Sequence, residues 1–155
     1  DEEAVLENKI AEYDAFLTKQ DPAFTVEELE EAMQKVMDQY AGGIGTHYQF
    51  NEKQLAMAEE KIKKLQILAK GLAAADMHEL MFIYELKERL TVCLTVIAHL
   101  RARKETRWHS FAENLDYPEK SDAWLCYVNS KKNGDQITMI RRDLVKGGET
   151  YEHRD

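Results

Sequence analysis

Apolar side chains recur every three or four residues along the first hundred positions, a spacing typical of amphipathic helices. A first helix is predicted over residues 2–19, and Pro22 follows its end. A second helix begins after Thr25, because Glu28 stands three residues later and completes a capping box. Gly42 is suited to end this helix in a left-handed turn. The apolar stripes of the two helices are Leu6, Ile10, Tyr13 and Leu17, and Val26, Leu29, Met33, Val36 and Tyr40.

Two longer helices are predicted over residues 51–72 and 76–103. The capping boxes at their starts pair Asn51 with Gln54 and Asp76 with Glu79. The third helix has a narrow apolar seam of Leu55, Ala58, Ile62, Leu65, Leu68 and Leu72. The fourth has a seam of Leu80, Ile83, Leu86, Leu90, Leu94, Ile97 and Leu100, with Met81, Phe82, Val92, Cys93 and Val96 beside it. Such a wide apolar surface indicates that the fourth helix is either the central helix of a bundle or packs partly on something outside this chain.

The period of the pattern changes after about residue 120. "AWLCYVNS" and "DQITMIRR" have the composition of strands, and an Asn133-Gly134 pair lies between them, so a β-hairpin is predicted. The fold class is therefore mainly α: a three-helix, spectrin-repeat-like bundle with an extra N-terminal helix and a small C-terminal hairpin. The expected organisation is an N-terminal helix and linker over 1–24, a helical bundle over 25–105, and an irregular aromatic segment, hairpin and polar tail over 106–155.

Charge and composition narrow the classes of partner. The 155 residues include 21 basic and 29 acidic side chains, a net charge of −8, which argues against nucleic acid. No apolar run approaches the roughly 20 residues that a membrane span needs. The two cysteines, Cys93 and Cys126, form neither a metal-binding spacing nor a disulfide framework, so a cytoplasmic location is expected. The chain does not begin with methionine and starts inside a helical pattern, so we expect a piece of a longer polypeptide.

Residues with catalytic, cofactor-binding or metal-binding patterns are not found. The Glu-x-x-His motifs of a di-iron bundle are missing, and His78 and His99 would lie about 30 Å apart along one helix. The glycines at 42–45 follow a predicted helix and lack the spacing of a dinucleotide-binding loop. The sequence therefore predicts no catalytic residue, no bound cofactor and no metal site in this chain.

The end of the fourth helix combines basic and aromatic side chains. Cations at a helix C-terminus each contribute about 0.3–1 kcal/mol, which explains the basic residues over 101–104. This effect does not explain the aromatic residues that follow, and arginine with large aromatic residues is typical of buried contacts. The segment packs either on its own bundle or on another domain or subunit. The candidate interface residues are Arg103, Arg107, Trp108, Phe111, Tyr117 and Trp124.

Several short motifs carry a resemblance to a known family. "ETRW" followed by "DYP" and "AWLCYVNS" resembles the tail of the succinate dehydrogenase and fumarate reductase flavoproteins. "MQKVMDQYAGGIGTHY", "NEKQL", "DMHELM", "RKETRW" and "YVNS" are similar, in this order, to the alpha subunits of the adenylylsulfate reductases in that family. "HSFAEN" and "DLVKGGETYEHRD" depart from the pattern, so the substrate stays open between adenylylsulfate and a dicarboxylate.

The resemblance implies a longer polypeptide with an FAD-binding domain, a capping domain and this helical module as its last part. FAD would belong to the parent enzyme and iron–sulfur clusters to a partner subunit, so the expected partners are these two domains and that subunit. The module itself would be a scaffold without bound FAD and without catalytic residues. Two other classes are kept open: a free-standing helical module that binds a partner helix, and a metal-dependent bundle enzyme.

Overall fold

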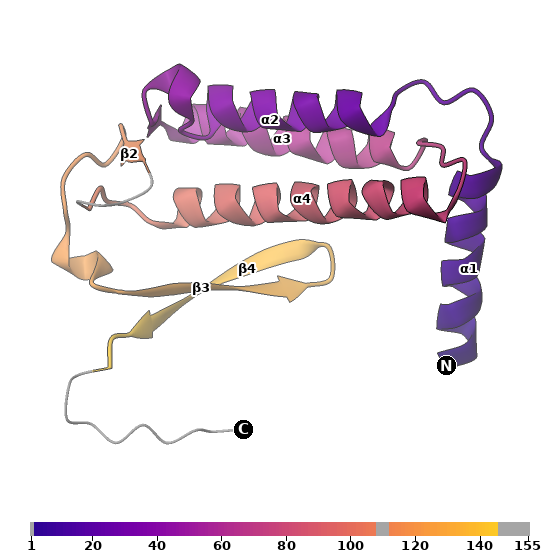
Figure 1. Ribbon diagram of the computed structural model, residues 1–155. Coiled ribbons are helices and arrows are strands. Elements are labelled where there is room, and N and C mark those ends of the chain that lie inside the picture. The colour runs from indigo at the N-terminus through magenta and orange to yellow at the C-terminus, as the bar shows by residue number, and fades with distance from the viewer. Residues whose placement is uncertain (1, 108–111, 146–155) are drawn as a thin grey trace.

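The structure is a computed structural model, and it describes residues 2–107 and 112–145. Three helices lie side by side in an up-down-up bundle, a further helix crosses one end of it, and a β-hairpin runs along the last helix (Figure 1). This arrangement confirms the predicted fold class. The helices are α1 (Glu2–Thr18), α2 (Val26–Tyr40), α3 (Glu52–Ala69) and α4 (Met77–Ala102), with short 3-10 turns η1 (Ile44–Thr46) and η2 (Asp122–Trp124). The strands are β1 (Gln49–Phe50), β2 (Glu113–Asn114), β3 (Cys126–Asn133) and β4 (Gln136–Asp143).

The helix starts follow the predicted capping chemistry with one difference. The capping boxes at Thr25 and Asn51 have both of their hydrogen bonds, as predicted. At α4, the Asp76 side chain accepts a hydrogen bond from the backbone N–H of Glu79 at 2.9 Å. The Glu79 carboxylate, however, accepts from the N–H of Ala75 at 2.7 Å and not from that of Asp76. The prediction of a third capping box is therefore wrong in one bond, because the acid reaches one residue further back.

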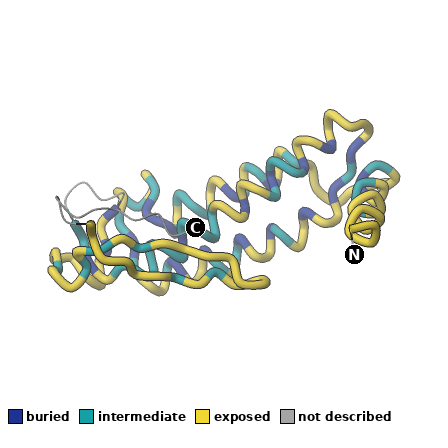
Figure 2. Tube along the Cα trace, turned by 90° about the horizontal axis from the view of Figure 1, so that it is seen from below, coloured by how far each residue is buried: buried dark blue, intermediate teal, exposed yellow. Residues whose placement is uncertain are grey.

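Helix α4 is the central element of the core. It packs against the other three helices and against both strands of the hairpin, as predicted for the central helix of a bundle. Three apolar residues beside its seam, Met81, Phe82 and Val92, are nevertheless exposed, so this packing covers only part of the wide apolar surface. All seven residues of its predicted seam belong to the core or pack against it. On α3 the prediction is wrong at one position, since Leu68 is exposed and Ala69 is buried in its place. Buried positions lie along the inner sides of the bundle helices, whereas the hairpin and the free end of α1 are exposed (Figure 2).

Helix α1 contacts the bundle mainly through its C-terminal half. The buried Phe16 and the neighbouring Tyr13 both meet the ring of Tyr84 edge-on, with ring centroids 6.1 and 5.3 Å apart. The ammonium groups of Lys87 and then Lys9 bind the Glu12 carboxylate and lower its pKa to about 2. The predicted stripe is therefore covered at Tyr13 and Leu17 but open at its other end, where Leu6 is 61% and Ile10 is 49% exposed.

A short loop closes the end of the bundle opposite α1. Gly42 follows α2 with φ of +77°, the left-handed turn that the sequence predicts. Two residues of this loop, strand β1, then pair in parallel with β2, which comes after α4. The pairing was not predicted. This pairing connects the loop between α2 and α3 with the segment between α4 and the hairpin.

Replacing Gly42 with alanine should lower the free energy of unfolding by about 1–3 kcal/mol, because the left-handed conformation is unfavourable for alanine. The added Cβ would also lie 2.8 Å from the Cβ of Ala112, closer than carbon atoms pack. Urea unfolding measures the effect. The matched control is Gly71→Ala, where the nearest atom to the added Cβ is 3.5 Å away and the backbone imposes no positive φ. Equal unfolding midpoints for the two variants would contradict this account of the turn.

The hairpin is present but begins later than predicted. Ala123 and Trp124 belong to the 3-10 turn η2 and not to a strand. The strands pair from Cys126 with Asp143 to Asn133 with Gln136, so the two loop residues are Gly134 and Asp135, one position after the predicted pair. Only the first of these two residues has a positive φ, +59°, which fits a type II′ turn.

Candidate interface at the end of the long helix

The buried carboxylate of Glu105 binds the segment that follows α4. The Glu105 side chain has 0% of its surface exposed. Its carboxylate accepts hydrogen bonds from the Arg103 guanidinium at 2.6 Å, from the Arg107 guanidinium at 3.0 and 2.9 Å, and from the backbone N–H of Ser121 at 2.9 Å. Two side chains on either side of Glu105 in sequence thus point back to it. We refer to Arg103, Glu105, Arg107 and Ser121 as the Glu105 cluster.

The arginines of the Glu105 cluster also bind the chain that leads into the hairpin. The Arg103 guanidinium donates to the carbonyls of Trp124 at 2.8 Å and Cys126 at 2.9 Å. The Arg107 guanidinium donates to the carbonyl of Ser121 at 3.2 Å. These bonds connect the end of α4 with the segment 121–126. The cluster therefore anchors the first strand of the hairpin to the bundle.

Electrostatics favour the charged form of Glu105. Burial raises the pKa of its carboxyl, but hydrogen bonds from the Ser121 N–H, Arg107 and Arg103 lower it more, so the pKa lies below its usual value of 4.5. The negative charge of the Glu105 carboxylate is thus balanced by the positive charges of the Arg103 and Arg107 guanidinium groups. Such a buried charge is tolerated because both carboxylate oxygens have donors.

This arrangement predicts a pH dependence of stability. Because the pKa of Glu105 is lower in the folded than in the unfolded chain, its stabilising contribution is complete above pH 4.5 and is lost as the pH falls through the folded value. We expect Glu105→Gln to reduce the difference in unfolding free energy between pH 7 and about pH 3. Urea unfolding at both pH values measures it. Glu7→Gln, which removes an exposed carboxylate on α1, is the control, and an equal reduction in the two variants would contradict the role of Glu105.

Aromatic residues lie beside the Glu105 cluster. The Trp124 ring has the guanidinium carbon of Arg141 4.2 Å and that of Arg103 5.9 Å from its centroid, so it makes cation–π contacts with both strand β4 and the end of α4. Arg141 also donates to the carbonyl of Ala123. Tyr117 is 42% exposed and has the ammonium group of Lys104 5.2 Å from its ring centroid.

Asn114 and Asp116, which lie between Arg107 and Ser121 in sequence, make hydrogen bonds within this segment and to helix α3. The side chain of the buried Asn114 accepts a hydrogen bond from the N–H of Asp116 at 3.0 Å, and the backbone N–H of Asn114 donates one to the Thr106 hydroxyl oxygen at 2.9 Å. Asp116 accepts from the N–H of Glu52 at 2.7 Å, which satisfies a free donor at the start of α3. The "DYP" motif therefore places an acid at a helix N-terminus, where negative charge is favourable.

The six predicted interface residues have different surroundings. Arg103, Arg107 and Trp124 come together around Glu105. Tyr117 joins the same region, because its carbonyl accepts a hydrogen bond from the Thr106 hydroxyl at 2.9 Å. Trp108 and Phe111 lie outside the described residues. Sequence reasoning missed Glu105, Asn114 and Asp116, and the alternation Arg-x-Glu-x-Arg over 103–107 was the signal for Glu105.

Two further observations concern the described residues. Among them, no three or more His, Cys, Asp or Glu side chains are placed to hold a metal ion. Over the same ranges, no helix has both the length and the apolar character that crossing a membrane requires.

Comparison with known proteins places the chain in a family. Residues 30–149 match the family described as "Fumarate reductase flavoprotein C-term". The chain therefore belongs to this C-terminal family of flavoprotein oxidoreductases. The alpha subunit of adenylylsulfate reductase from Megalodesulfovibrio gigas is 34% identical to it over 98 residues, which are 63% of this chain and 15% of that subunit.

Two solved structures have the same fold as this chain. Adenylylsulfate reductase from Archaeoglobus fulgidus superimposes with a TM-score of 0.85 and 34% identity, over 98% of this chain and 26% of the solved chain. Quinol fumarate reductase from E. coli superimposes with a TM-score of 0.76 and 18% identity, over 97% of this chain and 26% of that chain, which is a likeness of fold. The chain thus spans about a quarter of these solved chains, and its homologues are domains within a larger flavoprotein.

Proposed function

We propose that this chain is the C-terminal helical scaffold of an FAD-dependent oxidoreductase that resembles adenylylsulfate reductase or fumarate reductase. The observation that carries the proposal is the superposition of nearly the whole chain, 98%, on 26% of a solved adenylylsulfate reductase chain at 34% identity. In this proposal the parent polypeptide supplies the FAD-binding and capping domains, and a partner subunit carries the iron–sulfur clusters. The parent enzyme acts in the cytoplasm, in keeping with the two free cysteines.

The proposed task of the module is to pack on the flavin domain and on the iron–sulfur subunit, without taking part in the reaction. The side chains of Arg103, Glu105 and Arg107 support this division of labour, because they are committed to hydrogen bonds with one another and with the backbone of the segment 121–126. Flavin performs the redox step in such enzymes, and the surrounding protein binds and orients it.

We also propose that the outer side of this region forms part of the contact with the parent enzyme. Arg103 and Arg107 keep 31% and 29% of their side-chain surface exposed, and Tyr117 is more exposed still. Arginine and tyrosine at the edge of a packed cluster are suitable anchors for a protein interface. The proposed contact set is the predicted one, Arg103, Arg107, Trp108, Phe111, Tyr117 and Trp124.

The proposal is tested by purifying the full product of the native gene and the 155-residue chain alone and measuring the FAD bound to each. We expect the native gene to encode a flavin-binding sequence upstream of these residues, and its full product to be purified with stoichiometric FAD. The 155-residue chain alone should be colourless, with no flavin absorbance near 450 nm. A yellow preparation of the short chain with one flavin per molecule would contradict a scaffold role. A native reading frame of these 155 residues and no more would instead favour a free-standing interaction module.

A further inference from the structure

An open recess lies beside α4 on the side of the bundle that carries the hairpin. Helix α1 and the hairpin both project from this side (Figure 1), and the recess between them has a volume of about 940 Å³. Its apolar lining includes Leu94 of α4 and Ile67 of α3, which is 65% exposed. The loop of the hairpin at Gly134 and Asp135 lies at its edge. We use the name recess for this space, with α1 as one wall and the hairpin as the other.

The recess is positively charged, although the chain as a whole has a net charge of −8. Five lysines and two acids line it: Lys63, Lys70, Lys87, Lys131 and Lys132 with Glu12 and Asp135. Lys63 and Lys87 form ion pairs with Glu59 and Glu12. Within the described residues, the ammonium groups of Lys70 and Lys132 have no hydrogen bond or ion pair, and the Asp135 carboxylate has none either. The unpaired lysines outnumber this acid, so the recess presents unpaired positive charge beside its apolar lining.

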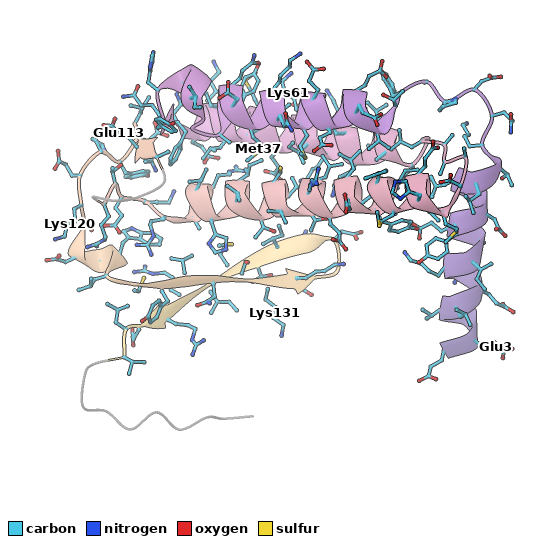
Figure 3. The ribbon with its side chains drawn as sticks, in the orientation of Figure 1. Glu3, Met37, Lys61, Glu113, Lys120 and Lys131 are labelled. Atoms are coloured by element: carbon cyan, nitrogen blue, oxygen red, sulfur yellow. The ribbon has the colours of Figure 1, made fainter. Side chains whose placement is uncertain are left out.

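The hairpin places one of these lysines on the side turned to the helices. In the register, Lys132 lies opposite Ile137 and Ser130 opposite Met139, and directly opposite residues in an antiparallel pair share a face. Ile137 and Met139 both border a cavity lined by Leu94 of α4, so this face is the inner one. The neighbouring Lys131 lies on the other face, away from the bundle (Figure 3). An apolar side chain at position 132 would favour packing of the hairpin tip on the bundle. The charged side chain of Lys132 disfavours that packing and can bind an anionic group instead.

The other wall adds apolar surface. Glu12 and Phe16 of α1 line the recess, and Val5 lies seven residues before Glu12, two helical turns away on the same face. Val5 is 69% exposed. An occupant that contacts both walls would therefore need apolar side chains towards α1 and carboxylates towards the lysines.

We propose that the recess binds a segment of polypeptide that carries both apolar side chains and carboxylates, supplied by the flavin-binding domain of the parent chain. This inference rests on the proposed function. The charge of the recess selects an acidic occupant, and its extent over α1, α3, α4 and the hairpin suits a polypeptide segment. A domain in the same polypeptide is favoured over a separate molecule, because covalent connection raises its effective concentration at the recess.

The test uses the complete flavoprotein purified from its native gene. A carbodiimide joins amines to carboxylates that are in direct contact, and mass spectrometry identifies the joined peptides. We expect Lys70 and Lys132 to be joined to aspartates or glutamates of the flavin-binding domain. Acetylation of the same protein should be about tenfold slower at these two lysines than at Lys19 and Lys53, since a lysine in contact reacts only when the contact opens. Lys19 and Lys53 are exposed controls that line neither the recess nor the proposed contact around Glu105.

Each other result overturns the inference. Equal acetylation of the four lysines means that the recess is open in the enzyme. Slow acetylation without a joined carboxylate means that the occupant is not acidic. A carboxylate from a partner subunit or from a second copy, distinguished by isotope labelling, identifies a different occupant. In all of these cases a full-length product with stoichiometric FAD still supports the proposed function, so the two proposals fail separately.

Discussion

Replacing Glu105 with alanine is expected to lower the free energy of unfolding by about 2–4 kcal/mol. The carboxylate is fully buried and receives hydrogen bonds from two guanidinium groups and one backbone N–H. Removing it leaves two positive charges side by side, with the Ser121 N–H deprived of its acceptor. The arginines keep about a third of their side-chain surface in water, 31% and 29%, and this limits the cost.

Chemical unfolding with hydrogen exchange measures this effect and locates it. We expect the hairpin amides over 126–143 to lose protection before those of the bundle, because the Glu105 cluster anchors the first strand. Glu60→Ala is the control: this acid pairs with Lys64 on an exposed helix surface, so its loss should cost less than about 0.5 kcal/mol. Equal costs for the two alanine variants would show that the cluster does not hold the hairpin.

Replacing Ile83 with alanine should lower the free energy of unfolding by about 2–5 kcal/mol. Ile83 has 0% exposure and lies on the inner side of α4, the helix that contacts every other helix. The truncation removes three carbon atoms from a closely packed core and leaves a cavity that the surrounding helices fill only in part. Against a total stability of about 5–15 kcal/mol, this is a large loss.

The matched control for Ile83→Ala lies on the same helix. Val92 is apolar and β-branched but 60% exposed, so Val92→Ala removes little buried surface. Thermal and urea unfolding should show a change within about 0.5 kcal/mol for this variant. A loss at Val92 as large as that at Ile83 would mean that the exposed side of α4 is covered in solution.

The helices could be predicted because their positions depend on local signals. The spacing of leucine and isoleucine, the side chains of Thr25 and Asn51, and the left-handed turn at Gly42 act within a few residues of each other. The predictions that were wrong concern how the elements are placed relative to one another in space. The stripe of α1 continues through Leu6 and Ile10, but periodicity does not reveal how far along a stripe the neighbouring helix extends.

The candidate site was predicted in part for the same reason. Arginines close to aromatic residues are visible in a sequence, so Arg103, Arg107 and Trp124 could be selected. The role of Glu105 depends on the backbone N–H of Ser121, sixteen residues further on, which approaches only after the chain has turned back. Likewise, Asp116 acts on a helix that begins 64 residues earlier. Contacts of this kind leave no periodic trace, because each involves a single side chain.

The parallel pairing of β1 with β2 bears on the order in which the chain folds. It joins residues 64 positions apart, and closing such a long loop has an entropic cost that two short strands do not repay alone. Helices α3 and α4 lie inside the loop, and their contacts are closer in sequence, so they form first and bring the two strands near each other. In a refolding experiment, the amides of Glu113 and Leu115, which donate to this pairing, should become protected after those of the helices.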